Sequence, residues 1–202
     1  NVENYGSKPA ISVKDQLNQW QTQTWKEFYS SVSDISKSLI ACNININDKI
    51  SIYSYNRSEW YSCYAASQYI NSVAVGIYHT CSSSEVEWIV SNSDSKIIFV
   101  GNNPNDNGET NKMPIHRLFN IMDKLEKVEF VVLMEGVKNL GHEKFISWKD
   151  FIKKGSEIDD TLINERNESI QLEGTSSLIY TSGTTGNPKG VEISYKNWEF
   201  EL

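Results

Sequence analysis

The sequence contains few cysteines, and none of them forms a pair of the kind that binds metal or serves in redox chemistry. Cys42, Cys63 and Cys81 are odd in number, widely spaced and without a Cys-x-x-Cys motif. This pattern argues against a disulfide framework. The three histidines are equally scattered. We therefore expect buried or half-buried free thiols in a reducing compartment, and no metal site on this chain.

Long apolar runs and an excess of positive charge are also absent. No apolar run reaches the ~18–20 residues that a membrane-spanning helix needs. The formal net charge of −7 argues against nucleic acid or an anionic membrane as the main partner. What is present, 39% hydrophobic and 11% aromatic residues, argues for a packed core and against a disordered chain. We expect a cytoplasmic, globular protein.

Apolar segments of strand length alternate with helical segments along most of the chain. We expect strands at residues 49–55, 73–78, 96–100, 128–134, 177–180 and 191–195. We expect helices at residues 24–41, 59–70, 82–93, 114–127 and 148–154, a surface loop at 102–108 and an irregular link at 155–173. This alternation predicts an α/β fold with a parallel-rich sheet and helices on both faces.

Polar residues mark where several of these helices begin. Thr24-x-x-Glu27 and Ser82-x-x-Glu85 are capping boxes, in which a hydroxyl and a carboxylate satisfy the first free backbone N–H groups. Either Asn56 or Ser58 can cap the helix expected from residue 59. These signals fix the starts of three helices more firmly than their ends.

The most informative segment is the glycine- and hydroxyl-rich stretch at residues 180–190, Tyr-Thr-Ser-Gly-Thr-Thr-Gly-Asn-Pro-Lys-Gly. Its glycines allow positive φ angles and bring backbone N–H groups close to an anion. Its hydroxyls can donate to phosphate oxygens, and its lysine adds a positive charge. We therefore assign the binding of a nucleotide's phosphates to Thr181, Ser182, Gly183, Thr184, Thr185, Gly186, Asn187, Pro188 and Lys189.

The spacing differs from that of a Walker A loop, which needs four residues between its glycines and then Lys-Ser/Thr at the start of a helix. Here two residues separate Gly183 from Gly186, and Gly190 stands where the Ser/Thr would be. The residues that follow alternate like a strand. A P-loop NTPase or kinase is therefore disfavoured, and a plain polar linker would not sit between two apolar strands.

A second group of candidates follows the strand expected at residues 73–78. Ligands of parallel sheets gather at the carboxyl ends of the strands. Tyr78, His79 and Thr80 lie at that edge and are candidate substrate-binding residues. For His79, a packed structural histidine is favoured over a ligand-binding one.

At the phosphate loop the chain resembles the adenylate-forming enzymes, which include acyl-CoA synthetases, luciferases and peptide-synthetase adenylation domains. The match covers nearly all of residues 181–190. Three earlier segments fall in the family's order and spacing: 24–29 (Thr-Trp-Lys-Glu-Phe-Tyr), 56–60 (Asn-Arg-Ser-Glu-Trp) and 76–80 (Gly-Ile-Tyr-His-Thr). Together they are most similar to the bubblegum-type long-chain and very-long-chain synthetases, over about residues 24–200, with 102–111 fitting poorly.

The resemblance implies that residues 1–202 are the N-terminal portion of the large AMP-binding domain, with the C-terminal domain outside this chain. It implies ATP-dependent conversion of a long-chain fatty acid to acyl-adenylate and then acyl-CoA, with ATP, Mg²⁺ and CoA, and no nucleic acid. The family's magnesium carboxylate, ribose-binding aspartate, hinge and C-terminal lysine are not in this sequence. We therefore expect no complete catalytic set here and no activity from this portion alone. Peripheral membrane association of the intact enzyme is compatible with the resemblance.

Two alternatives remain open beside that function. One is a non-catalytic interaction module with the same fold, and the other is a different acid substrate within the same superfamily. Trp25, Trp60, Trp88 and Trp148 lie at helical spacing, and we interpret them as core residues and not as the wall of an acyl-chain pocket.

Overall fold

A seven-stranded sheet organises the chain, and the computed structural model describes residues 2–14, 17–102, 113–134, 141–181 and 186–201. The sheet order is β7-β6-β5-β3-β4-β8-β9. Its strands are β3 (Lys49–Ser54), β4 (Val73–Ile77), β5 (Ser95–Gly101), β6 (Phe130–Leu133), β7 (Phe145–Ser147), β8 (Thr175–Thr181) and β9 (Lys189–Ser194). All neighbours are parallel except β8 and β9, which pair antiparallel. The predicted parallel-rich sheet is confirmed.

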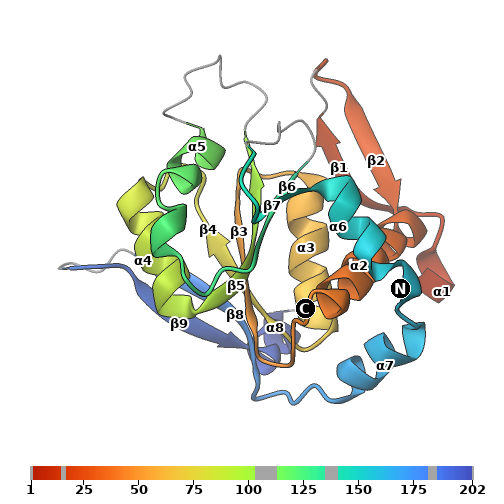
Figure 1. Ribbon diagram of the computed structural model, residues 1–202. Coiled ribbons are helices and arrows are strands. Elements are labelled where there is room, and N and C mark those ends of the chain that lie inside the picture. The colour runs from red at the N-terminus through yellow and green to blue at the C-terminus, as the bar shows by residue number, and fades with distance from the viewer. Residues whose placement is uncertain (1, 15–16, 103–112, 135–140, 182–185, 202) are drawn as a thin grey trace.

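Helices cover both faces of this sheet (Figure 1). One face carries α2 (Trp25–Ala41), α3 (Ser58–Tyr69) and α6 (Trp148–Lys154), and the other carries α4 (Ser83–Ser93) and α5 (Pro114–Phe119). Strand side chains alternate between the two cores: Ile52 and Phe99 pack toward α2 and α3, whereas Tyr53 and Val100 pack toward α4 and α5. The central strands are therefore buried on both sides, as parallel strands require.

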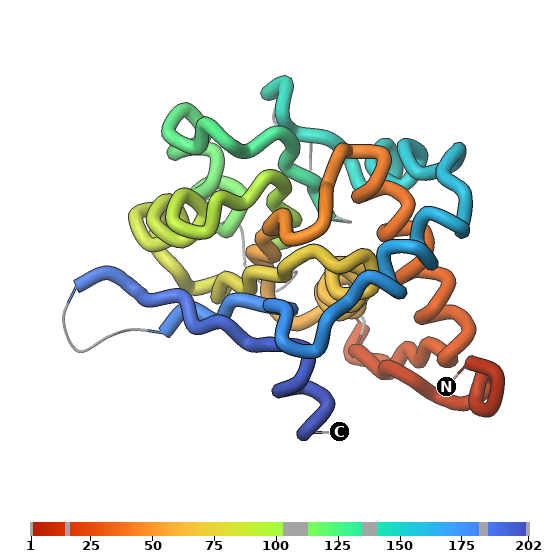
Figure 2. The backbone as a smooth tube through the Cα atoms, turned by 90° about the horizontal axis from the view of Figure 1, so that it is seen from below, coloured from red at the N-terminus to blue at the C-terminus, as the bar shows by residue number. Residues whose placement is uncertain are grey.

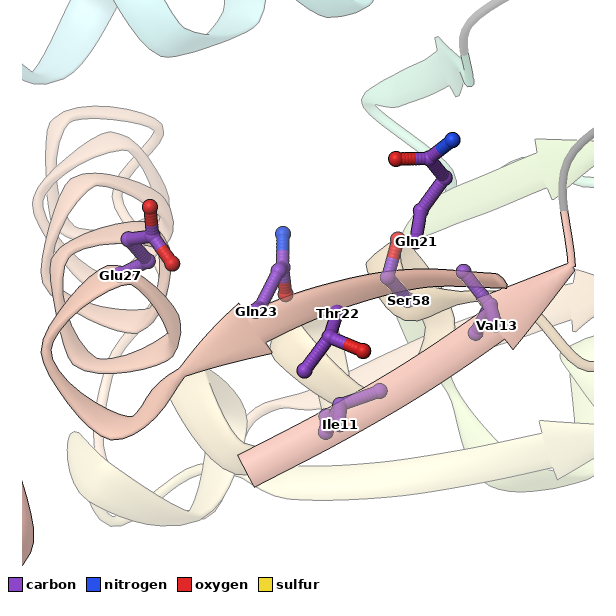
Figure 3. A pocket seen from close by; sticks show the side chains of 7 residues that line it. All are labelled: Ile11, Val13, Gln21, Thr22, Gln23, Glu27 and Ser58. Atoms are coloured by element: carbon purple, nitrogen blue, oxygen red, sulfur yellow. The ribbon is translucent and has the colours of Figure 1, made fainter. Parts of the chain in front are cut away.

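The N-terminal residues add a separate antiparallel hairpin that the sequence analysis did not predict. Helix α1 (Val2–Tyr5) leads into β1 (Pro9–Lys14), which pairs with β2 (Trp20–Thr24). A cavity of about 360 Å³ lies between this hairpin and the start of α3. Figure 3 shows its side chains, which come from β1, β2, α2 and α3: Ile11, Val13, Gln21, Thr22, Gln23, Glu27 and Ser58. None of them belongs to the predicted phosphate-binding or substrate-edge residues.

The helix starts follow the predicted caps in two of three cases. The Thr24 backbone N–H donates to Glu27 Oε2 at 2.8 Å, and the Ser82 backbone N–H donates to Glu85 Oε2 at 2.8 Å, so both capping boxes are confirmed. Helix α3 differs, because its N-cap is Arg57 and neither Asn56 nor Ser58 caps it. Arg57 Nε and Nη2 instead donate to the two oxygens of the Glu59 carboxylate at 2.7 and 2.8 Å.

Several predicted boundaries were wrong. The expected helix at 114–127 divides into α5 and the 3₁₀ turn η2 (Met122–Lys124), which buries Ile121, Met122 and Leu125 in the core beside α4. The expected irregular link at 155–173 contains η3 (Gly155–Glu157) and α7 (Asp160–Glu168). Ile163 is the buried side chain of α7, so the helix shows no apolar periodicity. Helix α8 (Tyr195–Glu201) and strand β7 were also not predicted.

The three cysteines lie inside the molecule and are free thiols, as expected. Cys42 and Cys63 are buried and Cys81 is half-buried. Burial raises the pKa of the Cys42 thiol to about 11, and burial also raises the pKa of Cys63. Helices of the described residues are too short or too polar to cross a membrane.

Gly155 is required where η3 packs against α2. A Cβ atom at this position would lie 2.6 Å from the backbone nitrogen of Ser38 and 2.8 Å from Ser38 Oγ. The φ angle of Gly155 is −78°, so the constraint is steric and not conformational. We expect Gly155→Ala to reduce the free energy of unfolding by about 1–3 kcal/mol. Urea unfolding followed by circular dichroism measures this, with Ser156→Ala on the exposed side of the same turn as control.

The ion pair of Arg57 and Glu59 predicts a pH dependence of stability. Burial raises the pKa of Glu59, but the hydrogen bonds and charge of Arg57 outweigh burial, so this pKa lies below its ordinary value of 4.5. A lowered pKa in the folded state adds stability that is present above the unfolded pKa and is lost as pH falls through the folded pKa. Glu59→Gln should therefore lower the free energy of unfolding at neutral pH. The difference in this free energy between the variant and the wild type should shrink below pH 4.5.

Urea titrations at neutral and acidic pH test this dependence. Glu87→Gln is the matched control. Glu87 pairs with Lys124 at the surface, where ion pairs contribute little to the free energy of unfolding. If the difference in the free energy of unfolding between Glu59→Gln and wild type stays constant down to strongly acidic pH, the lowered pKa of Glu59 is contradicted.

Candidate functional site

The candidate site begins at the hairpin of β8 and β9, at one edge of the sheet. Thr181 ends β8 and pairs with Lys189, which begins β9. Figure 2 shows these two strands, coloured blue, at the edge of the molecule. The chain after Lys189 is thus a strand and not a helix, which confirms that the loop is not of the Walker type. Four of the predicted phosphate-binding residues, Ser182, Gly183, Thr184 and Thr185, lie outside the described residues.

Thr181 and residues 186–189, which we call the mouth of the hairpin, are exposed to solvent for the most part. Gly186 has a φ of +88°, a conformation that glycine adopts without strain. Thr181, Asn187 and Lys189 are exposed and Pro188 is half-buried. Two predicted phosphate ligands from opposite strands, Thr181 and Lys189, are therefore paired side by side with access to a ligand.

The predicted substrate-edge residues lie at the same edge of the sheet. The parallel pairing of β4 and β8 ends with Gly76 opposite Ile179, and Tyr78 and Thr181 each lie two residues farther along their own segment. Tyr78 is 70% exposed. His79 and Thr80 are also exposed, so His79 is not a packed structural histidine.

An arginine from α5 holds the turn that follows β4. Arg117 Nη1 donates to the carbonyl oxygens of His79 and Cys81 at 3.1 and 2.9 Å. Tyr53 Oη donates to the same Cys81 carbonyl at 2.9 Å. The turn that carries His79 is thus fixed by two elements distant in sequence. No local sequence signal pointed to Arg117, because its role depends on the packing of α5.

An apolar cavity of about 510 Å³ opens beside this edge, between α3, β4, β8 and α8. Tyr78 and His79 line it together with Ile179 and Tyr180, whereas Thr80 does not. The remaining lining residues are Ser54, Asn56, Trp60, Tyr61, Tyr64, Gly76, Ile77, Ser177, Leu178 and Trp198. The cavity therefore joins the predicted substrate edge to the strand that leads into the phosphate loop.

Aromatic side chains form one wall of this cavity. Trp60 and Tyr64, one helical turn apart on α3, stack with ring centroids 5.3 Å apart, and Trp198 of α8 meets the Tyr64 ring edge-on at 6.1 Å. Tyr64 Oη donates to Ser177 Oγ at 3.1 Å, which satisfies the tyrosine hydroxyl at the wall. Such a surface suits an apolar or aromatic ligand group.

The interpretation of the four tryptophans as core residues was only partly correct. Trp148 packs against the core, and Trp60 packs against it while also lining the cavity. Trp88 is 37% exposed and lies on the surface of α4. Trp25 is half-buried at the start of α2 and is not among the residues that pack against the core. Helical spacing alone could not separate these environments, because it does not show what each face of a helix contacts.

The described residues contain no group of three His, Cys, Asp or Glu side chains that could hold a metal ion. The Mg²⁺ that the resemblance implies therefore finds no carboxylate cluster among these residues.

Comparisons with known proteins agree with this geometry. The profile of the AMP-binding enzyme family matches residues 1–201. The chain is 26% identical over 196 residues to the long-chain-fatty-acid–CoA ligase ACSBG2 of Xenopus laevis, and 28% identical over 202 residues to that of Rattus norvegicus. These alignments cover 97% of this chain and 25% and 28% of those proteins. The chain thus spans about a quarter of the length of the curated relatives it matches.

A solved structure has the same fold. The crystal structure of the anthranilate CoA ligase AuaEII in complex with anthranoyl-AMP superimposes with a TM-score of 0.77. The superposition covers 99% of this chain and 34% of that one, at 18% sequence identity. The resemblance to bubblegum-type synthetases is confirmed by the ACSBG relatives, and the α/β architecture by this structure. The chain belongs to the AMP-binding enzyme family.

Proposed function

We propose that this chain is the N-terminal portion of the AMP-binding domain of a long-chain fatty acid–CoA ligase. The observation that carries the proposal is the pairing of Thr181 with Lys189 at an open hairpin mouth, next to an apolar cavity. The family match supports the adenylate-forming chemistry, and the ACSBG relatives support a long-chain acid. The partners are then small molecules: a fatty acid, ATP and CoA.

The chemistry explains why an anion-binding hairpin is needed. A fatty carboxylate resists attack by a thiolate, so its oxygen first attacks the α-phosphorus of ATP and pyrophosphate leaves. The acyl-adenylate then reacts at its carbonyl carbon with the CoA thiolate, and AMP leaves. Negative charge grows on the departing phosphates in the first step, where donors fixed in advance lower the barrier.

In this proposal the described residues divide the work between them. The hydroxyl of Thr181 donates to a phosphate oxygen, Lys189 supplies positive charge, and Gly186 lets the backbone approach the phosphates. Asn187 and Pro188 determine the path of the backbone that leads to Lys189. The proposed phosphate-binding set is completed by Ser182, Gly183, Thr184 and Thr185. Tyr78 and His79 border the apolar cavity, and Thr80 lies on the turn beside it.

The acid is proposed to place its apolar part against the aromatic wall of Trp60, Tyr64 and Trp198. Burying hydrocarbon stabilises a complex by about 0.8 kcal/mol per methylene. A long-chain acid therefore gains more binding free energy from contact with these aromatic side chains than acetate does. ATP–pyrophosphate exchange by the intact protein, with palmitate, acetate and an aromatic acid compared, tests this choice. Exchange with the aromatic acid alone would indicate a different acid substrate, and exchange with none of them would favour a non-catalytic module.

Two substitutions at the hairpin mouth test the phosphate-binding roles. Thr181→Val removes a hydroxyl donor at nearly constant shape, and we expect adenylate formation to fall roughly 100-fold. Lys189→Met should have a milder effect of about 10-fold, because neighbouring backbone amides partly replace a flexible charge. Thioester formation from preformed acyl-adenylate and CoA should be nearly unchanged, since no pyrophosphate leaves in that step.

The two half-reactions are measured separately in the intact protein. Thr175→Val, at the opposite end of β8, and Lys196→Met, an exposed lysine paired with Glu173, are the matched controls. Equal losses in both half-reactions would show that the hairpin only maintains the fold, and the phosphate-binding roles would then be withdrawn.

A further inference from the structure

Helix α4 forms side-chain hydrogen bonds to both sides of the hairpin of β8 and β9, the predicted phosphate-binding segment that we call the phosphate hairpin. One contact reaches Tyr180 in β8, and the other reaches Pro188 just before β9. Trp88 Nε1 donates to the carbonyl oxygen of Pro188 at 2.9 Å. The hydroxyl of Tyr180 donates to Asn92 Oδ1 at 2.7 Å. Trp88 and Asn92 are four residues apart and so lie on the same face of the helix. Figure 1 shows α4 beside β9, in agreement with these contacts.

Tyr180 links the two strands of the hairpin to each other. It pairs with Gly190, and a Cβ atom on Gly190 would lie 3.1 Å from Cζ and 3.2 Å from the hydroxyl of Tyr180. The outer end of the ring therefore lies close to the backbone of β9 at Gly190. Burial raises the pKa of Tyr180, which keeps its hydroxyl protonated as a donor to Asn92. Helix α4 therefore contacts both arms of the hairpin, that is, the residues just before the loop and those just after it.

The contact of Trp88 does not resemble ordinary core packing. Its side chain is 37% exposed, and its polar N–H reaches a backbone carbonyl that precedes β9. The peptide group is planar, so the carbonyl of Pro188 and the N–H of Lys189 point in opposite directions within one plane. Holding the Pro188 carbonyl therefore also orients the backbone of Lys189.

We propose that Trp88, together with Asn92, is a positioning residue for the phosphate hairpin and sets the orientation of the arm that carries Lys189. The proposal rests on the proposed function for its chemical consequence. Trp88 does not touch the nucleotide in this arrangement; it acts through the Pro188–Lys189 peptide. Its loss should therefore weaken the step in which phosphate charge develops and leave the fold intact.

Trp88→Phe in the intact protein tests the proposal, because it removes the N–H donor and keeps an aromatic ring. We expect kcat/KM for ATP in adenylate formation to fall about 3- to 10-fold, as for loss of one hydrogen bond. The rate of thioester formation from preformed acyl-adenylate should not change. Tyr180→Phe, which removes the contact to Asn92, should affect the same half-reaction.

Trp25→Phe is the matched control. Trp25 lies on α2, where its ring meets Phe28 edge-on, and it makes no side-chain hydrogen bond with the described residues. Equal losses in Trp25→Phe and Trp88→Phe would overturn the positioning role. So would a Trp88→Phe defect that is equally large in both half-reactions.

Hydrogen exchange of the backbone separates this proposal from the proposed function. In Trp88→Phe, but not in Trp25→Phe, amides of the segment 186–194 should exchange about 3- to 10-fold faster. Unchanged exchange would overturn the anchoring contact whether or not the protein activates any acid. Faster exchange with unaltered adenylate formation would overturn the positioning role alone. If the wild-type protein activates no acid while exchange responds as expected, the proposed function fails and the anchoring contact stands.

Discussion

Burial of the central strands on both faces is the constraint on which the rest of the structure depends. β3 and β5 place Ile52 and Phe99 in one core and Tyr53 and Val100 in the other, so no ligand can reach these strands from either face. Access remains at the strand ends. The turn after β4 and the end of β8 meet at that edge, where Tyr78 and Thr181 are exposed.

The parts of the fold that could be predicted are those that local chemistry determines. The Ser82 and Glu85 capping box fixes the start of α4 whatever surrounds it, because both partners lie within one turn. Helix α7 also has a local N-cap, since the backbone N–H of Thr161 donates to Asp159 Oδ1 at 2.8 Å, but Ile163 is its buried side chain and no apolar periodicity follows the cap. Its packing depends on contacts to distant backbone, such as the bond from Asn167 Nδ2 to the carbonyl of Tyr69. Three-residue β7 likewise depends on contacts distant in sequence, since it pairs with β6 and its Phe145 packs in the core.

The same distinction holds at the candidate site. Glycines and hydroxyls close together in sequence led to the proposal of phosphate binding at the hairpin of β8 and β9, since an anion-binding loop is built from neighbouring residues. The aromatic wall could not be predicted, because Trp60 and Trp198 come from helices 138 residues apart (198 − 60) and meet through Tyr64 only in the folded chain. Helical spacing described Trp88 as apolar and gave no information about its N–H.

A hairpin at a sheet edge has to combine two opposing properties. β8 pairs with β4 only from Ser177 to Ile179, so the sheet ladder ends before the mouth at Thr181. In the proposed function an open mouth lets a polyphosphate enter, but strands without further support would lose the geometry that makes hydrogen-bond donors effective. Contacts from α4 to Tyr180 and Pro188 resolve this conflict, because they fix the arms from one side and leave the mouth exposed. In this proposal the packing of α4 alone couples the stability of the sheet edge to the geometry of the predicted phosphate-binding residues.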